Sequence, residues 1–345
     1  MKMLRFESDY MEGCHPAILR RLQEINLDKN VGYGLDPYCE SARNKICQAC
    51  GTPDAQVHFL VGGTQTNMLV IDAMLRYNDG IIALETGHIN VHESGAVEAC
   101  GHKVMPVKGR DGKYDIDALE QWLKAFYEET TAVGIEHYVM PRALYLSHPT
   151  ELGTLYTRRE LMRLRELCDQ YGLYLYLDGA RLGYGLMAQG GDLTLPDIAR
   201  YCDVFYIGGT KVGALMGEAV VVTNPNIELT RGLIKHRGAM LAKGWLLGVQ
   251  FDTLFTGGLY LKISRNAVDQ AMRLRRGMEL KGYKAYIDSP TNQQFFVMSN
   301  NKMEELAQKA AFDYITPAGD GHSVVRFATS WATTSEQVDA LLSLL

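Results

Sequence analysis

Polar side chains gather just beyond the ends of several apolar runs in this sequence of 345 residues. The runs at 57–62, 80–85, 142–147, 172–177 and 203–208 have the composition of buried strands. The residues that follow them include Gly63, Thr64 and Gln65, then His88, His148, Asp178 with Arg181, and Lys211. Because ligands of open α/β sheets bind beyond the C-terminal ends of the strands, we expect these residues to share one site.

The glycine turn in "GGTQTN", residues 62–67, is suited to hold an anion. Glycines let the backbone approach a phosphate, and the helix that follows offers free N–H groups at its N-terminus. Neither GxxxxGK[ST] nor GxGxxG with a distant acidic residue is present, which argues against a Walker loop and a nicotinamide site. A plain strand-to-helix turn is the alternative.

Asp178 and Lys211 extend this set toward one cofactor. Asp178 ends an apolar strand, where a carboxylate is costly unless it is paired, so it could hold a heteroaromatic nitrogen protonated. Lys211 follows another strand, where partial desolvation makes a lysine nucleophilic. The alternatives for Asp178 are a helix cap or an ion pair with Arg181. The alternative for Lys211 is a solvated lysine in a turn. Together with a phosphate cradle, the two residues are what pyridoxal 5′-phosphate requires.

Two histidines and a second arginine could act on a substrate at the same edge. His88 in "ETGHIN" could stack on a planar ring or move protons, and His148 in "SHPTELG" follows another strand. Arg326 in "SVVRFAT" lies on an apolar strand, where a guanidinium needs a carboxylate partner. The alternative for both histidines is a loop side chain that is hydrogen-bonded to the backbone. The alternative for Arg326 is an interdomain salt bridge.

The pattern that must position these residues is an α/β alternation. Strand-like runs lie at 57–62, 80–85, 102–108, 142–148, 172–178, 203–208 and 218–223, with amphipathic stretches between them. This alternation predicts a mostly parallel seven-stranded sheet between helices. A short turn precedes the run at 218–223, so we expect that strand to be antiparallel.

The character of the sequence changes after about residue 250. A long helical stretch leads to strands at 284–289, 293–299 and 323–329, and then to a helix that begins at Thr334 or Ser335. We therefore predict a large domain over 31–250, a smaller α+β domain over 251–345, and an N-terminal segment, 1–30, that docks on the smaller domain.

Composition and charge exclude several classes of protein. The formal net charge is -5, with no basic face for nucleic acid, and no apolar run is long enough for a membrane span. The N-terminus has no signal-peptide pattern, and the seven cysteines are scattered. "CQAC", residues 47–50, reads as a helix end stopped by Gly51, without a second pair at zinc spacing. We expect a soluble cytoplasmic protein without a metal.

The order "VGYGLDP … GGTQTN … GHINVHESGA … SHPTELG … LDGAR … GGTK … VVRFAT" resembles the threonine aldolase and β-eliminating lyase family of pyridoxal phosphate enzymes. The resemblance covers most of the chain, from about Ser8 to Arg326. It implies fold-type I, the aspartate aminotransferase-like architecture, and homodimers or homotetramers with shared active sites. It also implies a small amino-acid substrate.

The resemblance implies a role for each matching residue. Lys211 would bond to the cofactor's aldehyde carbon, Asp178 to its ring nitrogen, Gly63 and Thr64 with Gln65 to its phosphate, and His88 would stack on the ring. His148 would lie near the substrate's β-hydroxyl, where it or a water that it orients would take the hydroxyl proton. Ser8, Arg181 and Arg326 would hold the substrate carboxylate, and Tyr33 would lie near a subunit interface.

Four positions around this site depart from the family pattern. Tyr10, Pro149, Thr210 and Leu241 stand where the family usually has threonine, asparagine, serine and arginine. The expected reaction is cleavage of the Cα–Cβ bond of a threonine-like β-hydroxy-α-amino acid. β-Elimination or other Cα chemistry on a different amino acid is the alternative, and a non-catalytic binding protein on a degenerate scaffold is the second.

Overall fold

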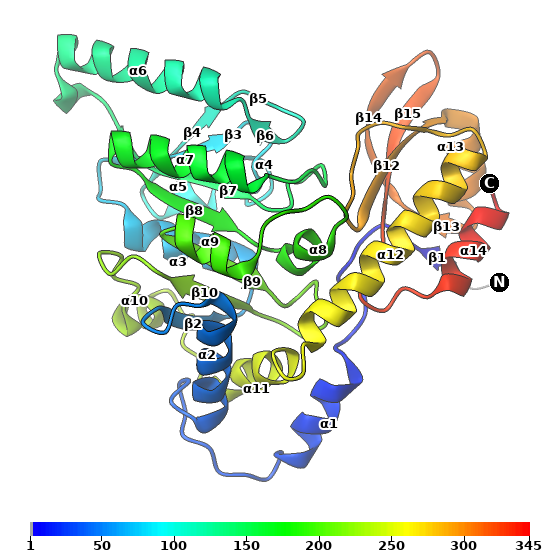
Figure 1. The fold of residues 1–345 in the computed structure, drawn as a ribbon, viewed down its shortest axis with the longest axis horizontal. Helices are drawn as coiled ribbons and strands as arrows, with labels where there is room; N and C mark the ends of the chain where they lie inside the picture. Colours follow the sequence, from blue (N-terminus) through cyan, green and yellow to red (C-terminus); the bar gives the residue numbers. More distant parts are fainter. Residues whose placement is uncertain (1–2) are drawn as a thin grey trace.

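A seven-stranded sheet forms the centre of the larger region in the computed structural model, which describes residues 3–345 (Figure 1). Its order is β2-β10-β9-β8-β7-β3-β4. The strands are β2 (Gln56–Leu60), β10 (Glu218–Val222), β9 (Val204–Gly208), β8 (Tyr174–Asp178), β7 (Met140–Ser147), β3 (Asp79–Leu84) and β4 (Lys103–Val107). All seven lie where the sequence predicts them.

Only β10 runs against the others within this sheet. It pairs antiparallel with both β2 and β9, so the predicted reversal is confirmed. The C-terminal ends of the remaining six strands therefore meet at one edge of the sheet. Because β10 is reversed, its first residue, Glu218, lies at that same edge, opposite Leu60 and Gly208.

Helices cover both faces of the sheet, as the alternation predicts. Successive residues of β3 show why: Ile82 and Leu84 pack into one buried cluster, and Ile81 and Ala83 into another. The first cluster lies under α2 (Pro37–Cys50), α6 (Ile116–Val133), α7 (Arg158–Tyr171), α9 (Leu195–Tyr201) and α11 (Trp245–Leu254). The second lies under α3 (Gly63–Met74), α5 (Ala96–Ala99) and α10 (Arg231–His236).

The helix boundaries follow local signals in the sequence. Thr157 and Glu160 form a capping box at the start of α7, and Gly172 ends that helix in the left-handed conformation. Gly51 ends α2 in the same way, which confirms the predicted helix end at "CQAC". The short elements of this region are α4 (His88–Val91), α8 (Leu182–Met187), η1 (Ile135–His137) and the pair β5 (Gly109–Arg110) and β6 (Lys113–Tyr114).

The smaller region is built on a four-stranded antiparallel sheet of order β11-β12-β15-β14. Its strands are β11 (Lys284–Ala285), β12 (Gln293–Ser299), β15 (His322–Ala328) and β14 (Asp313–Gly319). Helices α12 (Leu259–Leu280), α13 (Asn300–Ala307) and α14 (Ser335–Ser343) accompany it, and Thr334 caps α14 as predicted. Strand β14 was not predicted, because it is a mostly exposed edge strand that contains Pro317.

The N-terminal segment contacts both regions. Strand β1 (Leu4–Arg5) pairs with β13 (Ala310–Ala311) of the smaller region, whereas helix α1 (Pro16–Glu24) packs against α11. Figure 1 shows this segment passing between the regions, while the long helix α12 spans them. The division of the chain at residues 30 and 250 stays a prediction.

No helix within residues 3–345 is long and apolar enough to cross a membrane. The seven cysteines are free, and Cys39 and Cys50 lie buried in α2. Burial raises the pKa of the Cys50 thiol to about 12, which keeps it protonated at neutral pH.

Candidate active site

Two adjoining cavities lie at the edge of the sheet where the strands end. The inner cavity, of about 340 Å³, is lined by six predicted site residues: Gly63, Thr64, His88, Asp178, Arg181 and Lys211. The outer cavity, of about 630 Å³, is lined by Arg326 and shares Tyr10, His88, Glu151, Arg181 and Lys211 with the inner one. The chain therefore brings most of the predicted side chains together, as the strand-end rule requires.

Asp178 ends β8 at the floor of the inner cavity, and four donors hold its carboxylate. The hydroxyl of Tyr145 donates to Oδ2 over 2.6 Å and that of Tyr206 to Oδ1 over 2.5 Å. The Asn67 amide donates to Oδ2 over 3.3 Å, and the backbone N–H of Ala180 to Oδ1 over 3.0 Å. These donors satisfy both oxygens of a buried side chain. The alternative of an ion pair between Asp178 and Arg181 is wrong.

A hydrogen-bond network joins Asp178 to the ring of His88. The Asn67 amide that reaches Asp178 also donates to Oε1 of Glu93 over 2.6 Å, and Nδ1 of His88 lies 2.7 Å from the same oxygen. Burial would lower the pKa of His88, but the hydrogen bond to Glu93 and the charge of Asp178 raise it. The network fixes the orientation of an imidazole that lines both cavities.

Lys211 enters the inner cavity from the turn between β9 and β10. The Tyr184 hydroxyl donates to its backbone oxygen, and its amine lies 6.0 Å from the centre of the Tyr10 ring. Burial lowers the pKa of this amine, and the nearby charge of Arg181 lowers it further. A lysine in such surroundings has more of the neutral, nucleophilic form than an exposed one.

Glu218 is a buried carboxylate beside Lys211 that sequence reasoning missed. Its Oε2 accepts the backbone N–H of Gly209 over 3.3 Å, and it lines the inner cavity. Burial raises its pKa to about 8, although the charge of Lys211 opposes the shift. The prediction considered only the C-terminal ends of strands, and Glu218 begins a reversed one.

The two glycine turns of the site serve different purposes. In the turn before Lys211, a Cβ on Gly208 would lie 2.3 Å from the backbone oxygen of Ala180, so packing within the chain requires glycine. A Cβ on Gly62, in contrast, would meet no atom of the described chain within 4 Å, although Gly62 lines the inner cavity. Glycine at 62 leaves open space in front of the N-terminus of α3.

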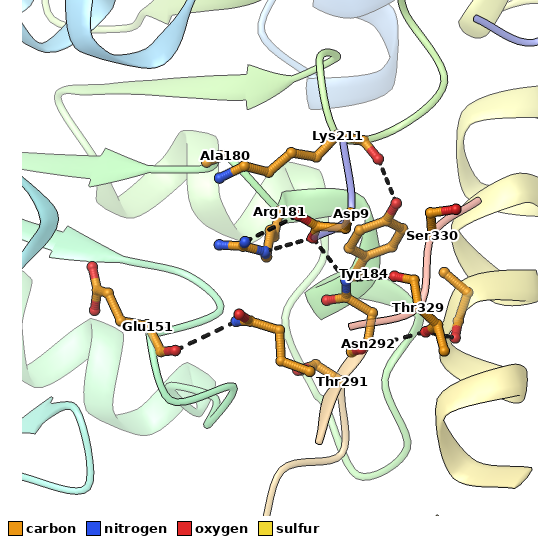
Figure 2. Close-up of polar contacts among 12 residues, drawn as sticks. Asp9, Glu151, Ala180, Arg181, Tyr184, Lys211, Thr291, Asn292, Thr329 and Ser330 are labelled. Carbon is orange, nitrogen blue, oxygen red and sulfur yellow. Dashed lines mark hydrogen bonds and ion pairs between the residues drawn. The ribbon is translucent and has the colours of Figure 1, made fainter. Parts of the chain in front are cut away.

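Arg181 is bound by a carboxylate that sequence reasoning did not single out (Figure 2). Its Nε and Nη2 donate to the two oxygens of Asp9 over 2.7 and 3.0 Å, and the Asn292 amide donates to Asp9 over 2.8 Å. Burial would raise the pKa of Asp9, but the charges of Arg181 and Lys211 lower it to about 2. The signal was available in "SDY", where Asp9 lies between two residues that the resemblance singled out.

Arg326 reaches the outer cavity from β15 of the smaller region. Its guanidinium pairs with Asp313 on the neighbouring strand β14, and its Nη1 donates to the Gln293 side chain over 2.8 Å. Two polar atoms nearby are buried without a hydrogen-bond partner in the described chain, Nε of Arg326 and Oγ of Ser8. Such atoms indicate room for an acceptor that the chain itself does not supply.

The structure does not bring His148 into either cavity. Its ring is buried beside Gly185, and its Nδ1 lies 3.4 Å from the backbone N–H of Tyr156, which it accepts. Burial lowers its pKa to about 4. The prediction that His148 takes the β-hydroxyl proton is therefore corrected, because a buried ring outside the cavities does not reach a substrate in them.

Ser8, Gln65 and Tyr33 are predicted site residues that line neither cavity. The Gln65 side chain accepts the backbone N–H of Val61 over 3.3 Å, which stabilises the turn before α3. Tyr33 is 45% exposed and adopts a φ of 61°, and the Lys235 amine lies 5.0 Å from the centre of its ring. Neither Gln65 nor Tyr33 contributes to the inner cavity of its own chain.

Glu151 is the most prominent lining residue that the prediction omitted. It lies three positions after His148 in "SHPTELG" and lines both cavities. The prediction chose the histidine of this stretch for its residue type and its position at a strand end. In the structure, Glu151 and Ser147 line the inner cavity instead.

Known proteins resemble this chain along nearly its whole length. A family profile described as beta-eliminating lyase matches residues 5–306. Low specificity L-threonine aldolases from Pseudomonas sp. (strain NCIMB 10558) and Pseudomonas aeruginosa are 26% and 27% identical, and each match covers 98% of this chain and 95% of the relative. A solved structure of Leishmania major threonine aldolase is 40% identical, with a TM-score of 0.94 over 99% of this chain and 98% of that one.

More distant structures share the fold alone. An aspartate aminotransferase from Thermus thermophilus is 16% identical, with a TM-score of 0.72 over 99% of this chain and 90% of that one. The predicted aspartate aminotransferase-like α/β fold is therefore confirmed.

Proposed function

Because this chain belongs to the beta-eliminating lyase family, we propose that it cleaves the Cα–Cβ bond of a β-hydroxy-α-amino acid to glycine and an aldehyde. The chain is a pyridoxal phosphate-dependent carbon–carbon lyase, and the sequence resemblance to this family is confirmed. A threonine-like substrate is the proposal, as are the roles of individual residues.

The inner cavity fits pyridoxal phosphate, and one observation carries this: Lys211, Asp178 and the N-terminus of α3 line a single cavity. The open space at Gly62 and the free N–H groups of α3 would receive the phosphate. Asp178 would pair with the ring nitrogen and keep it protonated, and His88 would lie against the ring. The amine of Lys211 would bond to the aldehyde carbon.

The cofactor supplies an electron-withdrawing ring that stabilises the electron pair released at Cα. The residues of the chain would bind and orient the substrate. Arg326 would bind the substrate carboxylate in the outer cavity with the help of Ser8, whose buried hydroxyl has no partner in the described chain. Arg181 contributes its charge near Lys211, but two of its nitrogens are already committed to Asp9.

The test is an absorbance spectrum followed by a panel of amino acids. Visible absorbance on addition of pyridoxal phosphate, then glycine plus an aldehyde from threonine, allo-threonine or an aryl analogue, is the expected result. A 2-oxo acid plus ammonia, 2-oxobutyrate from threonine or pyruvate from serine, would instead identify a β-eliminating lyase. A colourless protein that ignores the cofactor would contradict the proposal and indicate a binding protein.

Lys211→Ala tests the assignment of the lysine. We expect this variant to lose both the covalent absorbance and turnover, while Lys124→Ala, the same change at an amine whose side chain is 72% exposed, retains them. A Lys211→Ala protein that kept the wild-type absorbance would show that another lysine binds the cofactor.

We also propose that the active unit is a homodimer or homotetramer. Tyr33 supports this, because it is exposed and lies outside the inner cavity of its own chain. Mixing Tyr33→Ala protein with Lys211→Ala protein under exchange conditions should restore part of the activity if each site takes Tyr33 from a second copy. Light scattering that gave only a monomer would contradict the proposal.

A further inference from the structure

Glu151 occupies the boundary between the inner and outer cavities. It follows β7 by four residues and lines both spaces, together with Arg181 and Lys211. Figure 2 shows the side chains of Glu151, Arg181 and Lys211 approaching one region from three separate segments of the chain. A carboxyl group at this boundary would face the part of a substrate that lies between the cofactor and the carboxylate site.

The two oxygens of Glu151 have different surroundings. The Ser147 hydroxyl donates to Oε1 over 2.6 Å, and the backbone N–H of His88 donates to the same oxygen over 3.2 Å. Both of these donors bind Oε1, and neither reaches Oε2. Two donors thus hold the carboxyl group in place and leave its second oxygen available to a ligand.

The main chain of Glu151 is fixed as well. The Gln293 amide, from β12 of the smaller region, donates to its backbone oxygen over 3.4 Å. Ser147, in turn, lies 3.4 Å from the hydroxyl of Tyr145, which binds Asp178. Ser147 of the larger region and Gln293 of the smaller region therefore both hold Glu151 in place.

Charges around Glu151 act in opposite directions. Burial raises the pKa of its carboxyl group, the hydrogen bond from Ser147 lowers it, and the charge of Asp178 raises it again. The net effect is a carboxyl group whose pKa is raised above that of an exposed glutamate, which suits a general base near neutral pH. The other titratable and charged groups that line the same two cavities are Tyr10, Glu85, His88, His92, Asp178, Arg181, Tyr206, Lys211, Glu218 and Arg326.

We propose that Glu151, through Oε2, takes the proton of the substrate's β-hydroxyl, the task that the sequence assigned to His148. This inference rests on the proposed function. The O–H bond breaks and its electron pair forms the second C–O bond of the aldehyde. The electron pair of the broken Cα–Cβ bond remains on Cα, where the cofactor would stabilise it. Cα takes up a proton when glycine forms. Ser147 is the positioning residue that holds Oε1.

Glu151→Gln keeps the shape of the side chain and removes its basicity. Cleavage should fall by roughly 10²–10⁴-fold. Exchange of the α-hydrogens of glycine with deuterium, followed by proton NMR, should continue near the wild-type rate, because that exchange needs no base at a β-hydroxyl. Glu128→Gln makes the same change on the exposed face of α6 and should leave both reactions unchanged. Glu151→Gln protein that still cleaved at the wild-type rate, or that lost both reactions, would overturn the assignment.

A readout without turnover comes from infrared difference spectra of the protein prepared without cofactor. The wild type should show a protonated carboxyl band that titrates above the ordinary range of glutamate and that is missing from Glu151→Gln. Because Glu218 is also buried, Glu218→Gln serves to assign its band separately. The absence of a difference between wild type and Glu151→Gln would contradict the proposal.

Ser147→Ala tests the role of Glu151 as the base even if the Glu151→Gln protein does not fold. Loss of the hydroxyl that stabilises the ionised form should raise the pKa of Glu151 and move the acidic limb of the kcat profile to higher pH. An unmoved limb would count against Glu151. Failure of the proposed function has a different signature, since the wild type itself would then exchange glycine hydrogens but cleave no β-hydroxy amino acid.

Discussion

Arg181 and Arg326 both line the outer cavity and both pair with an aspartate, yet their surroundings differ. Arg181 meets Asp9, whose side chain is fully buried, while Arg326 meets Asp313, whose side chain is 41% exposed. Asp9 comes from the N-terminal segment and also accepts from Asn292 of the smaller region, whereas Asp313 lies on the strand adjacent to Arg326. The first pair joins three parts of the chain, and the second is local.

This difference separates a structural arginine from one that is free to bind a ligand. A buried pair is costly to break, because either partner alone would leave an unpaired charge away from water. A partly exposed carboxylate, in contrast, can turn toward solvent when a substrate carboxylate takes its place. We therefore expect Arg326 to select the substrate and Arg181 to hold the two regions together.

Asp9→Asn should have the largest effect. The change removes the charge that neutralises Arg181 in a buried place, so unfolding should become easier by about 3–5 kcal/mol. Denaturant titration followed by circular dichroism measures this. Asp313→Asn, the matched change in the local pair, should cost about 1 kcal/mol or less. Equal losses in the two variants would remove the distinction between the arginines.

Acid should weaken the Arg181 pair in a defined range. The folded pKa of Asp9 is about 2, below the ordinary value of 3.8, so its contribution to stability is present above pH 4 and is lost as pH falls toward 2. By linkage the contribution is about 2–3 kcal/mol. Stability measured across this range should fall more steeply for the wild type than for Asp9→Asn. Parallel curves would mean that Asp9 is not paired in solution.

Arg326→Gln should affect the substrate more than the fold. Loss of a charge-assisted contact of about 1.5–3 kcal/mol should raise KM by roughly 10–150-fold, with a smaller change in kcat. The affinity for glycine, measured through the cofactor absorbance, should fall in parallel because glycine carries the same carboxylate. An unchanged KM would place the carboxylate site elsewhere.

Asp313→Asn should give the smallest change and the opposite sign. Since Asp313 competes with a substrate carboxylate for Arg326, its removal should lower KM by a small factor, equivalent to at most about 1 kcal/mol. Initial-rate measurements at low ionic strength are the most sensitive test. A higher KM would mean that Asp313 orients Arg326 instead of competing for it.

Much of the fold was predictable because its signals are local. All seven strands of the large sheet, the reversal of β10 and the capped ends of α2, α7 and α14 follow from apolar runs, turn lengths and cap residues. Edge strand β14 was missed because an exposed strand with a proline lacks the apolar pattern.

The site was predictable only where a residue type is informative by itself. Lys211 and Asp178 stood out because a charge at the end of an apolar strand is unusual. Glu93 and Glu151 lie in loops and carried no such signal, and Asp9 was indicated only by its neighbours in "SDY", because its partner Arg181 is 172 residues away. His148 was chosen for its chemistry, and the sequence does not reveal that its ring packs inside.

The position of the N-terminal segment has a consequence for biosynthesis. Phe6 accepts a backbone hydrogen bond from Ala328, and the backbone oxygen of Glu7 accepts one from Arg326, 319 residues later. At translation rates of about 5–20 residues per second, Glu7 waits roughly 16–60 s on the ribosome before its partner exists. Strand β1 and the residues that follow it therefore complete their native contacts only after β13 and β15 have been synthesised.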